Sequence, residues 1–247
     1  MNTSNNNGFT IIETLLFLSV SGLLAVGILA GSGAVIGQQR YRDSVNTLKS
    51  DIQHDYNKVS NTINNRSKDW SCDTNANTES LEIDNYRGTS ECVLLGRLIV
   101  ISDGDNITTS SVIGYRKNSD VKNSDVDELA NYHIKLSDID KESSRIGWQS
   151  KALIPGTDTL LNSSILILRS PLSGSIQTFI SNNLPSTELN ELVKNENQEN
   201  PTVLCIAPSE GLFVGGMLAI KIDAFASNQG AITIRPPIPP EEDGSCD

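Results

Sequence analysis

The chain has 247 residues and a formal net charge of −11, from 30 acidic and 19 basic side chains. This length is enough for one domain of ordinary size in addition to a membrane helix. An acidic surface repels phosphate backbones, so the composition argues against non-specific nucleic-acid binding by the isolated chain.

A long apolar run begins close to the N-terminus. Between Phe9 and Gly37 the one formally charged side chain is Glu13, and about 20 apolar residues suffice to cross a bilayer as a helix. A carboxylate near the start of such a helix is costly unless it is paired, and a plain membrane anchor would not need it. We therefore expect a transmembrane helix over residues 9–37, preceded by a short polar segment at 1–8.

The residues Gly8–Glu13 (GFTIIE), followed by the apolar run, resemble the class III signal of type IV pilins and pseudopilins. This resemblance is confined to the N-terminal helix. It implies that a membrane-embedded prepilin peptidase removes the leader, residues 1–8, by cutting after Gly8, and that Phe9 becomes an N-methylated terminus. It also implies that Glu13 lies in a filament core and faces the N-terminal amine of a neighbouring subunit. A buried carboxylate stays charged only when it has such a partner.

The resemblance further implies a structural, non-enzymatic subunit of a type IV pilus or a type II secretion-like filament, with a size that favours a minor pilin. Its expected partners are other pilin subunits through the N-terminal helix, the prepilin peptidase, an inner-membrane assembly platform and, before assembly, membrane lipid. The expected location is the cytoplasmic membrane, with a single pass, and then an extracellular filament at the cell surface. A pilus, a secretion and a competence system fit the residues equally well.

Other interpretations of the N-terminal segment stay open. A cleaved secretory signal has a basic start and an apolar region of about 7–15 residues, whereas residues 1–8 contain no Lys or Arg and the apolar run here is longer. An uncleaved anchor would make the protein a membrane-anchored extracellular binding or adhesion domain that does not polymerise. An exported enzyme with an unusual anchor is the third alternative.

An amphipathic pattern continues beyond Gly37. Steps of three and four predict that the helix extends through 38–65, ends near Asn64–Asn65, and lays one apolar stripe on the protein's own sheet. A stripe for a separate coiled-coil partner is the alternative. His54 falls on the polar side and is expected to be exposed. The stripe consists of Tyr41, Val45, Leu48, Ile52, Tyr56, Val59 and Ile63.

The remainder, 66–247, is predicted to form a β-rich head, which makes the fold class α+β: a long helix packed on an antiparallel sheet. Turn chemistry is expected at Ser102–Asn106, and irregular chain at Trp70–Gly88 and Ser119–Asp140, apart from a strand at Tyr132–Leu136. Short helical segments are predicted at Asp125–Ala130 and Thr187–Lys194. The predicted strands are Cys92–Ile101, Ile107–Tyr115, Arg145–Leu153, Ser164–Arg169, Ser175–Ile180, Thr202–Ala207, Leu212–Ile222 and Ala231–Ile234.

The four cysteines, Cys72, Cys92, Cys205 and Cys246, all follow the apolar helix. An even count in an exported domain favours disulfides. The spacing favours Cys72–Cys92 and Cys205–Cys246 among three possible connectivities, and the second bridge would hold the C-terminal tail. A zinc site is the alternative, but the chain has neither a CxxC motif nor clustered histidines.

No catalytic pattern stands out. The chain lacks the GxSxG, HExxH and P-loop motifs, and a structural or solvated role is expected for both histidines, His54 and His133. The acidic turns Asp103–Asn106 and Glu241–Gly244 have oxygens suited to calcium, but such turns are common in acidic proteins. Accordingly we expect no enzyme activity, no cofactor and no metal. We expect Trp70 and Trp148 to lie in the core or to be half-buried, and a ligand-facing role is the alternative.

Overall fold

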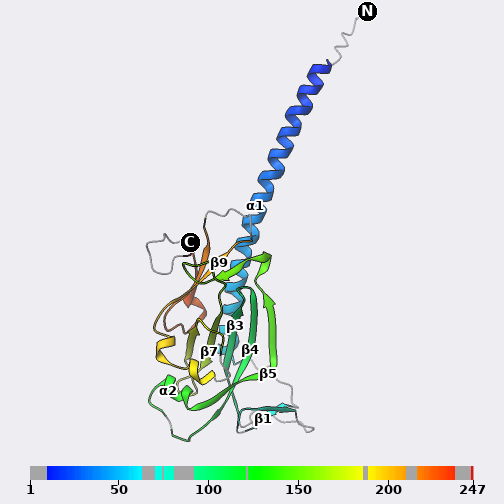
Figure 1. Cartoon of the computed structure of the whole chain (residues 1–247). Helices are drawn as coiled ribbons and strands as arrows, with labels where there is room; N and C mark the ends of the chain where they lie inside the picture. The colour runs from blue at the N-terminus through cyan, green and yellow to red at the C-terminus, as the bar shows by residue number, and fades with distance from the viewer. Residues whose placement is uncertain are drawn as a thin grey trace, which may run out of the picture.

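A computed structural model describes residues 10–62, 70–73, 75–80, 92–120, 122–185, 189–209, 216–236 and 246. In this part of the chain, one long helix projects from a head built of antiparallel strands (Figure 1). The architecture is α+β, as predicted. The predicted cleavage residues Gly8 and Phe9 lie outside the described residues.

Helix α1 (Ile11–Ser60) is continuous over 50 residues. It begins at the N-cap Thr10 and ends at the C-cap Asn61. The predicted end near Asn64–Asn65 is wrong, because Thr62 has a φ of +49°, which a right-handed helix does not accommodate.

The larger sheet has five antiparallel strands in the order β5-β4-β3-β7-β8. The turn predicted at Ser102–Asn106 is present, with positive φ at Asp103 and Gly104. The strand predicted at Tyr132–Leu136 is present but continues to Arg145. The irregular chain predicted for residues 137–140 is therefore wrong, because these residues extend the strand at the sheet edge and expose charged side chains to solvent. The strands are β3 (Val93–Ser102), β4 (Asn106–Arg116), β5 (Tyr132–Arg145), β7 (Ser163–Arg169) and β8 (Ile176–Ser181).

The smaller sheet has four antiparallel strands in the order β11-β10-β9-β6. The strand predicted over Arg145–Leu153 is wrong, because the chain crosses there from one sheet to the other. It leaves the five-stranded sheet at Arg145, passes through the short 3-10 helix η1 (Gly147–Gln149) and enters the four-stranded sheet. The strands are β6 (Lys151–Leu153), β9 (Thr202–Ala207), β10 (Leu218–Ile222) and β11 (Ile232–Arg235).

Short elements complete the described head. The chain predicted to be irregular at Trp70–Gly88 contains a small hairpin, and its other residues from 81 onward lie outside the description. Helix α2 occupies the predicted residues, and the helix predicted at Thr187–Lys194 is a single 3-10 turn. These elements are β1 (Trp70–Cys72), β2 (Thr78–Ser80), α2 (Asp125–Ala130), η2 (Leu189–Leu192), η3 (Asn195–Asn197) and η4 (Gln229–Ala231).

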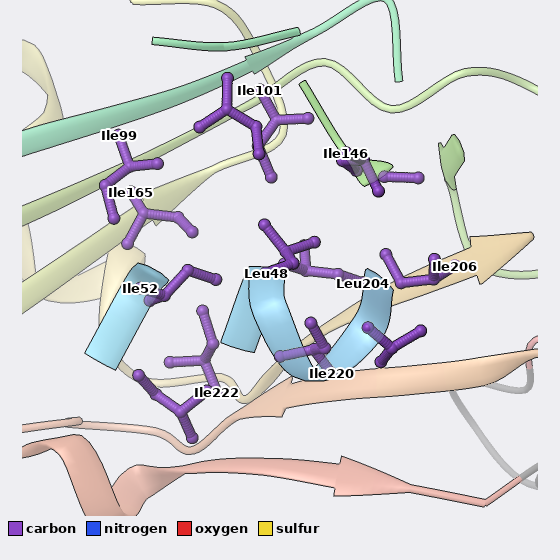
Figure 2. Close-up of a cluster of buried hydrophobic side chains, with 14 of the residues drawn as sticks. Leu48, Ile52, Ile99, Ile101, Ile146, Ile165, Leu204, Ile206, Ile220 and Ile222 are labelled. Carbon is purple, nitrogen blue, oxygen red and sulfur yellow. The ribbon is translucent and has the colours of Figure 1, made fainter. Parts of the chain in front are cut away.

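The main core lies where α1 meets both sheets. Figure 2 shows Leu48 and Ile52 of α1 among side chains from strands of the two sheets. The described members of the predicted stripe, from Tyr41 to Val59, are all buried, whereas residues on the opposite side of this helix segment, such as His54, are exposed. The stripe therefore packs on the protein's own sheets, as predicted. The sheet side chains labelled in this core are Ile99, Ile101, Ile165, Leu204, Ile206, Ile220 and Ile222.

A second apolar cluster covers the other face of the five-stranded sheet, where α2 and η2 lie against it. The described part of the chain therefore has four layers, which are the smaller sheet, α1, the larger sheet and the short helices. This cluster includes Leu95, Leu98, Val112, Leu129, Ile134, Leu166, Leu168, Phe179, Leu189 and Leu192.

Two disulfides join segments of the head, and they are the pairs that the spacing favoured. Cys72 of β1 is bonded to Cys92, next to β3, with 5.7 Å between the Cα atoms. Cys205 of β9 is bonded to Cys246, with 5.3 Å between the Cα atoms. The second bridge fixes the C-terminal end to the four-stranded sheet.

Candidate functional site: an exposed apolar helix fixed to the head

The first half of α1 exposes apolar side chains on all sides. Residues 11–37 form about 40 Å of helix at 1.5 Å per residue, compared with about 30 Å for the hydrocarbon core of a bilayer. Within the described chain, α1 is the one helix long and apolar enough to span a membrane. Its large exposed apolar side chains are Ile11, Ile12, Leu15, Leu16, Phe17, Leu18, Val20, Leu23, Leu24, Val26, Ile28, Leu29, Val35 and Ile36.

Hydroxyl groups in this apolar surface bond within the helix. Thr14 donates to the carbonyl of Ile11 at 2.9 Å, and Ser19 donates to that of Leu16 at 2.8 Å. Ser32 makes the same kind of bond one turn back, at 2.7 Å. These hydroxyls need no water, so they are compatible with an apolar environment.

Glu13 closes a capping box with Thr10 at the start of α1. Its carboxylate accepts from the backbone N–H of Thr10 at 3.2 Å, and the Thr10 hydroxyl accepts from the N–H of Glu13 at 3.3 Å. Glu13 was predicted to be a charge that needs a partner. Its capping role was not predicted, although the Thr-x-x-Glu spacing before an apolar run is the usual signal of a capping box.

Two tyrosines of the stripe attach α1 to the head through their hydroxyls. The Tyr41 hydroxyl donates to the carbonyl of Ile206 in β9 and accepts from the N–H of Leu218 in β10, each at 2.6 Å. The Tyr56 hydroxyl lies 2.7 Å from that of Thr178 in β8. Burial raises the pKa of both tyrosines, which favours the neutral hydroxyls that these bonds require. One face of α1 is thereby bonded to both sheets.

A buried ion cluster adds a third attachment. Arg97 of β3, only 4% exposed, places Nε 2.7 Å from an oxygen of Asp55 in α1 and Nη1 2.7 Å from an oxygen of Asp140 in β5. Ser111 of β4 donates to the same Asp140 oxygen at 2.9 Å. Burial raises the pKa of Asp55, and the Arg97 guanidinium opposes this rise. Arg97 lies in a strand that was predicted from its apolar residues, and no role was predicted for its charge. A lone Arg in such a strand nevertheless indicates a buried partner of opposite charge.

The end of the apolar half meets the crossover between the sheets. The guanidinium of Arg40 lies 4.7 Å from the ring centroid of Trp148 in η1, a cation–π geometry. Trp148 was predicted to lie in the core or to be half-buried, but the residue is exposed, at 55%. The side chain of Trp70 lies outside the description.

A hollow of about 590 Å³ lies elsewhere on the head. It is lined by residues of β8, η3 and the four-stranded sheet, and it combines apolar side chains with amide and hydroxyl groups, the cations Lys221 and Arg235 and the carboxylate of Glu196. Its amide side chains are Asn182, Asn197 and Asn200.

The remaining candidates from the sequence form no site in the described chain. His54 is exposed, as predicted, and His133 lies in β5 but is also exposed, so it has no place in the core. The described residues include no group of three or more His, Cys, Asp or Glu side chains placed to hold a metal ion. Of the two acidic turns, Glu241–Gly244 lies outside the described residues.

Comparison with family models, with curated proteins and with solved structures found no match to this chain. The features that point to a function are therefore those of the chain itself: the exposed apolar half of α1, Glu13 at its start, and the firm attachment of its second half to the head.

Proposed function

We propose that this chain is a structural subunit, a minor pilin or pseudopilin, of a type IV pilus or type II secretion-like filament. Before assembly it crosses the cytoplasmic membrane once. Prepilin peptidase cuts after Gly8, Phe9 becomes N-methylated, and the subunits then associate through α1, with the head on the outside of the filament.

The observation that carries this proposal is the two-part character of one unbroken helix. A helix that is apolar all round is stable only in lipid or among other helices. In α1 the apolar half, residues 11–37, continues without a break into a second half that is bonded to both sheets of the head. Such a helix suits a subunit that leaves the membrane for a helical filament core while carrying its head along.

Glu13 supports the same proposal. A carboxylate in an apolar environment is costly and usually marks a function. The capping box neutralises no charge, because the partners of the Glu13 carboxylate are an amide and a hydroxyl. The methylated amine of Phe9 in a neighbouring subunit would supply the missing positive charge and would also set the axial register, since a slipped register leaves the charge unpaired.

A second candidate is a membrane-anchored extracellular binding or adhesion domain that does not polymerise. The capping box favours it, because it gives Glu13 a structural role within the chain. The 590 Å³ hollow on the head also favours it, since its mixture of apolar side chains, amides and charged groups suits an amphipathic ligand.

Mass spectrometry of the N-terminal peptide tests the proposal directly. The protein is isolated from its native membrane fraction, alongside a Gly8→Val variant. We expect the wild-type chain to begin at N-methyl-Phe9 and the variant to keep its leader, because the peptidase must approach the backbone closely at Gly8. An intact Met1 leader in the wild type would refute processing as a prepilin, and normal processing of the variant would do the same.

Three substitutions separate the charge of Glu13 from its capping role. Glu13→Gln keeps an N3 residue that can cap but removes the charge, Glu13→Ala removes both, and Thr10→Ala breaks the cap but keeps the charge. For a filament subunit we expect both Glu13 variants to remain in the membrane but to be depleted from sheared filaments, with Thr10→Ala little affected. For a non-polymerising anchor, Glu13→Gln should behave as wild type. The measurement is the ratio of filament to membrane protein by immunoblot.

A further inference from the structure

We propose that Trp148 and Arg40 together form a contact site for phospholipid headgroups, and that this site holds the head at a fixed depth and tilt on the membrane that α1 crosses. This inference rests on the proposed membrane insertion but not on polymerisation. We call the pair the headgroup site.

The headgroup site lies where a bilayer surface is expected. After Glu13, the next charged residue along α1 is Arg40, three residues beyond Gly37 at the end of the apolar run. A helix that fills the hydrocarbon core with residues 11–37 brings Arg40 to headgroup level as it leaves. Trp148 stands beside Arg40 at this level although it belongs to the head, far away in sequence.

The head holds Trp148 outward at an energetic cost. Both Trp148 and Gln149 have left-handed backbones, with φ of 56° and 57°, a strained conformation for residues other than glycine. Bonds on either side of them hold the loop in place. The hydroxyls of buried Ser150 and of Ser44 in α1 lie 2.9 Å apart. The N–H of Ile146 donates to the carbonyl of Asp105, in the turn between β3 and β4, at 2.9 Å. The crossover is therefore strained to present a large apolar ring to the outside.

The chemistry of the pair suits a phospholipid interface. Tryptophan and arginine each combine an apolar body with a polar tip and gather at headgroup level. The guanidinium of Arg40 is suited to a phosphate oxygen, and the indole of Trp148 to the carbonyl region just below. The first two charges after the apolar run are Arg40 and Arg42, although the chain carries a net charge of −11. A hollow of about 290 Å³ adjoins the pair and is lined also by Gly37 and Ser150.

Depth-dependent fluorescence quenching tests the proposal on the full chain. A Trp70→Phe variant leaves Trp148 as the only tryptophan and is reconstituted into phosphatidylcholine–phosphatidylglycerol vesicles. Nitroxides are carried either on the headgroup or midway along the acyl chain. Because tryptophan prefers the interface, we expect headgroup nitroxides to quench roughly twofold or more strongly than mid-chain ones. Should Trp70→Phe fold poorly, the difference in quenching between wild type and Trp148→Phe gives the same quantity.

Arg40→Gln should weaken headgroup quenching, because it removes both the phosphate contact and the cation–π partner, whereas the matched control Arg42→Gln should not. Absence of quenching by either lipid, with Trp148 open to aqueous acrylamide, would overturn the proposal. So would protection of Trp148 from acrylamide in filaments without any lipid quenching, since that result assigns the site to a neighbouring subunit.

Alkaline carbonate extraction of the same vesicles distinguishes this failure from failure of the proposed function. Protein that resists extraction but shows no lipid quenching is inserted without a headgroup site, and the proposed function stands. Protein that is released by carbonate is not inserted at all, which refutes the headgroup site and the membrane stage of the proposed function together.

Discussion

Replacing Arg97 with Met tests whether the buried ion cluster fixes α1 to the head. Met has similar length and is apolar, so the substitution removes the guanidinium that lies 2.7 Å from an oxygen of Asp55 and 2.7 Å from an oxygen of Asp140. For Asp55 the weaker attraction of Lys58 remains. Removing one member of a buried ion pair costs about 3–5 kcal/mol. Because Asp140 is partly exposed and still accepts from Ser111, we expect the lower end, about 3 kcal/mol at neutral pH.

The cost of Arg97→Met should shrink as the pH falls. Burial raises the pKa of Asp55 in the folded protein, and Arg97 is the main group opposing this rise. Without Arg97, the folded-state pKa of Asp55 moves further above its unfolded value. A folded state that binds the proton more tightly than the unfolded state gains stability as the pH falls through the folded pKa toward the lower, unfolded pKa. The penalty is therefore fully present above the folded pKa and relieved below it.

Equilibrium urea unfolding in non-ionic detergent, followed by tryptophan fluorescence, measures both effects. We expect the variant's unfolding midpoint to fall well below that of wild type at neutral pH, and the gap to narrow as the pH is lowered toward the ordinary Asp pKa of about 4. Arg42→Met, on the exposed side of α1, is the matched control and should leave the midpoint unchanged. A cost below about 1 kcal/mol, typical of a surface pair, or a gap independent of pH would refute the reasoning.

The remaining predictions use the same urea assay. Tyr41→Phe should cost about 1–3 kcal/mol, because the buried carbonyl of Ile206 in β9 loses its donor and the partly buried N–H of Leu218 in β10 loses its acceptor; a cost near zero would mean that these groups find other partners. Replacing Cys205 and Cys246 with Ser should cost about 2–4 kcal/mol, because the bridge closes a long loop, and reduction of the wild type should have a similar effect. Gly27→Ala should be neutral or stabilising by about 0.5–1 kcal/mol, since nothing in the described chain lies near the added Cβ. Gly96→Ala should be destabilising, because its Cβ would meet the backbone of β7; equal effects at the two glycines would contradict this contrast.

The second half of α1 was predictable because its surroundings are one-sided. A helix that lies on sheets through one face needs apolar residues at steps of three and four, and the positions from Tyr41 to Val59 follow that rule and are buried. The strands β3, β4, β7 and β9 were predicted for a related reason: their apolar residues are continuous or alternating. The early end of the helix depends on one positive φ at Thr62, which no periodicity records.

The second half of β5 and the crossover between the two sheets were not predictable from the local sequence pattern. Most side chains in the second half of β5 are exposed, so their polar composition resembles that of a loop, and only pairing with β4 makes them a strand. The segment after Arg145 is apolar enough to suggest a strand, yet it changes sheets around Trp148. That change is set by bonds from Ile146 and Ser150 to residues distant in sequence.

The residues of the candidate site were likewise predictable from the sequence only in part. Glu13 was evident because a charge in an apolar run is rare, and its cap was readable from Thr10 three residues earlier. The ion cluster was not readable, because Arg97 takes its two carboxylates from α1 and β5, whose positions around β3 are fixed only by the tertiary fold. The exposure of Trp148 likewise follows from backbone strain that composition does not reveal.

The attachment of α1 to the head couples the orientation of the helix start to the orientation of the head. Because the helix is continuous from Ile11 to Ser60, the bonds of Tyr41 and Asp55 to the head fix the rotation of the exposed half as well. In the proposed filament, a pairing of Glu13 with a neighbouring terminus therefore sets the angular position of every head around the axis. Substitutions that loosen the attachment without touching Glu13, such as Arg97→Met, should then leave subunit incorporation intact but disorder the arrangement of heads along the filament. In the proposed filament, the start of α1 would thus govern the incorporation of subunits, and the junction of α1 with the head would govern the arrangement of the heads.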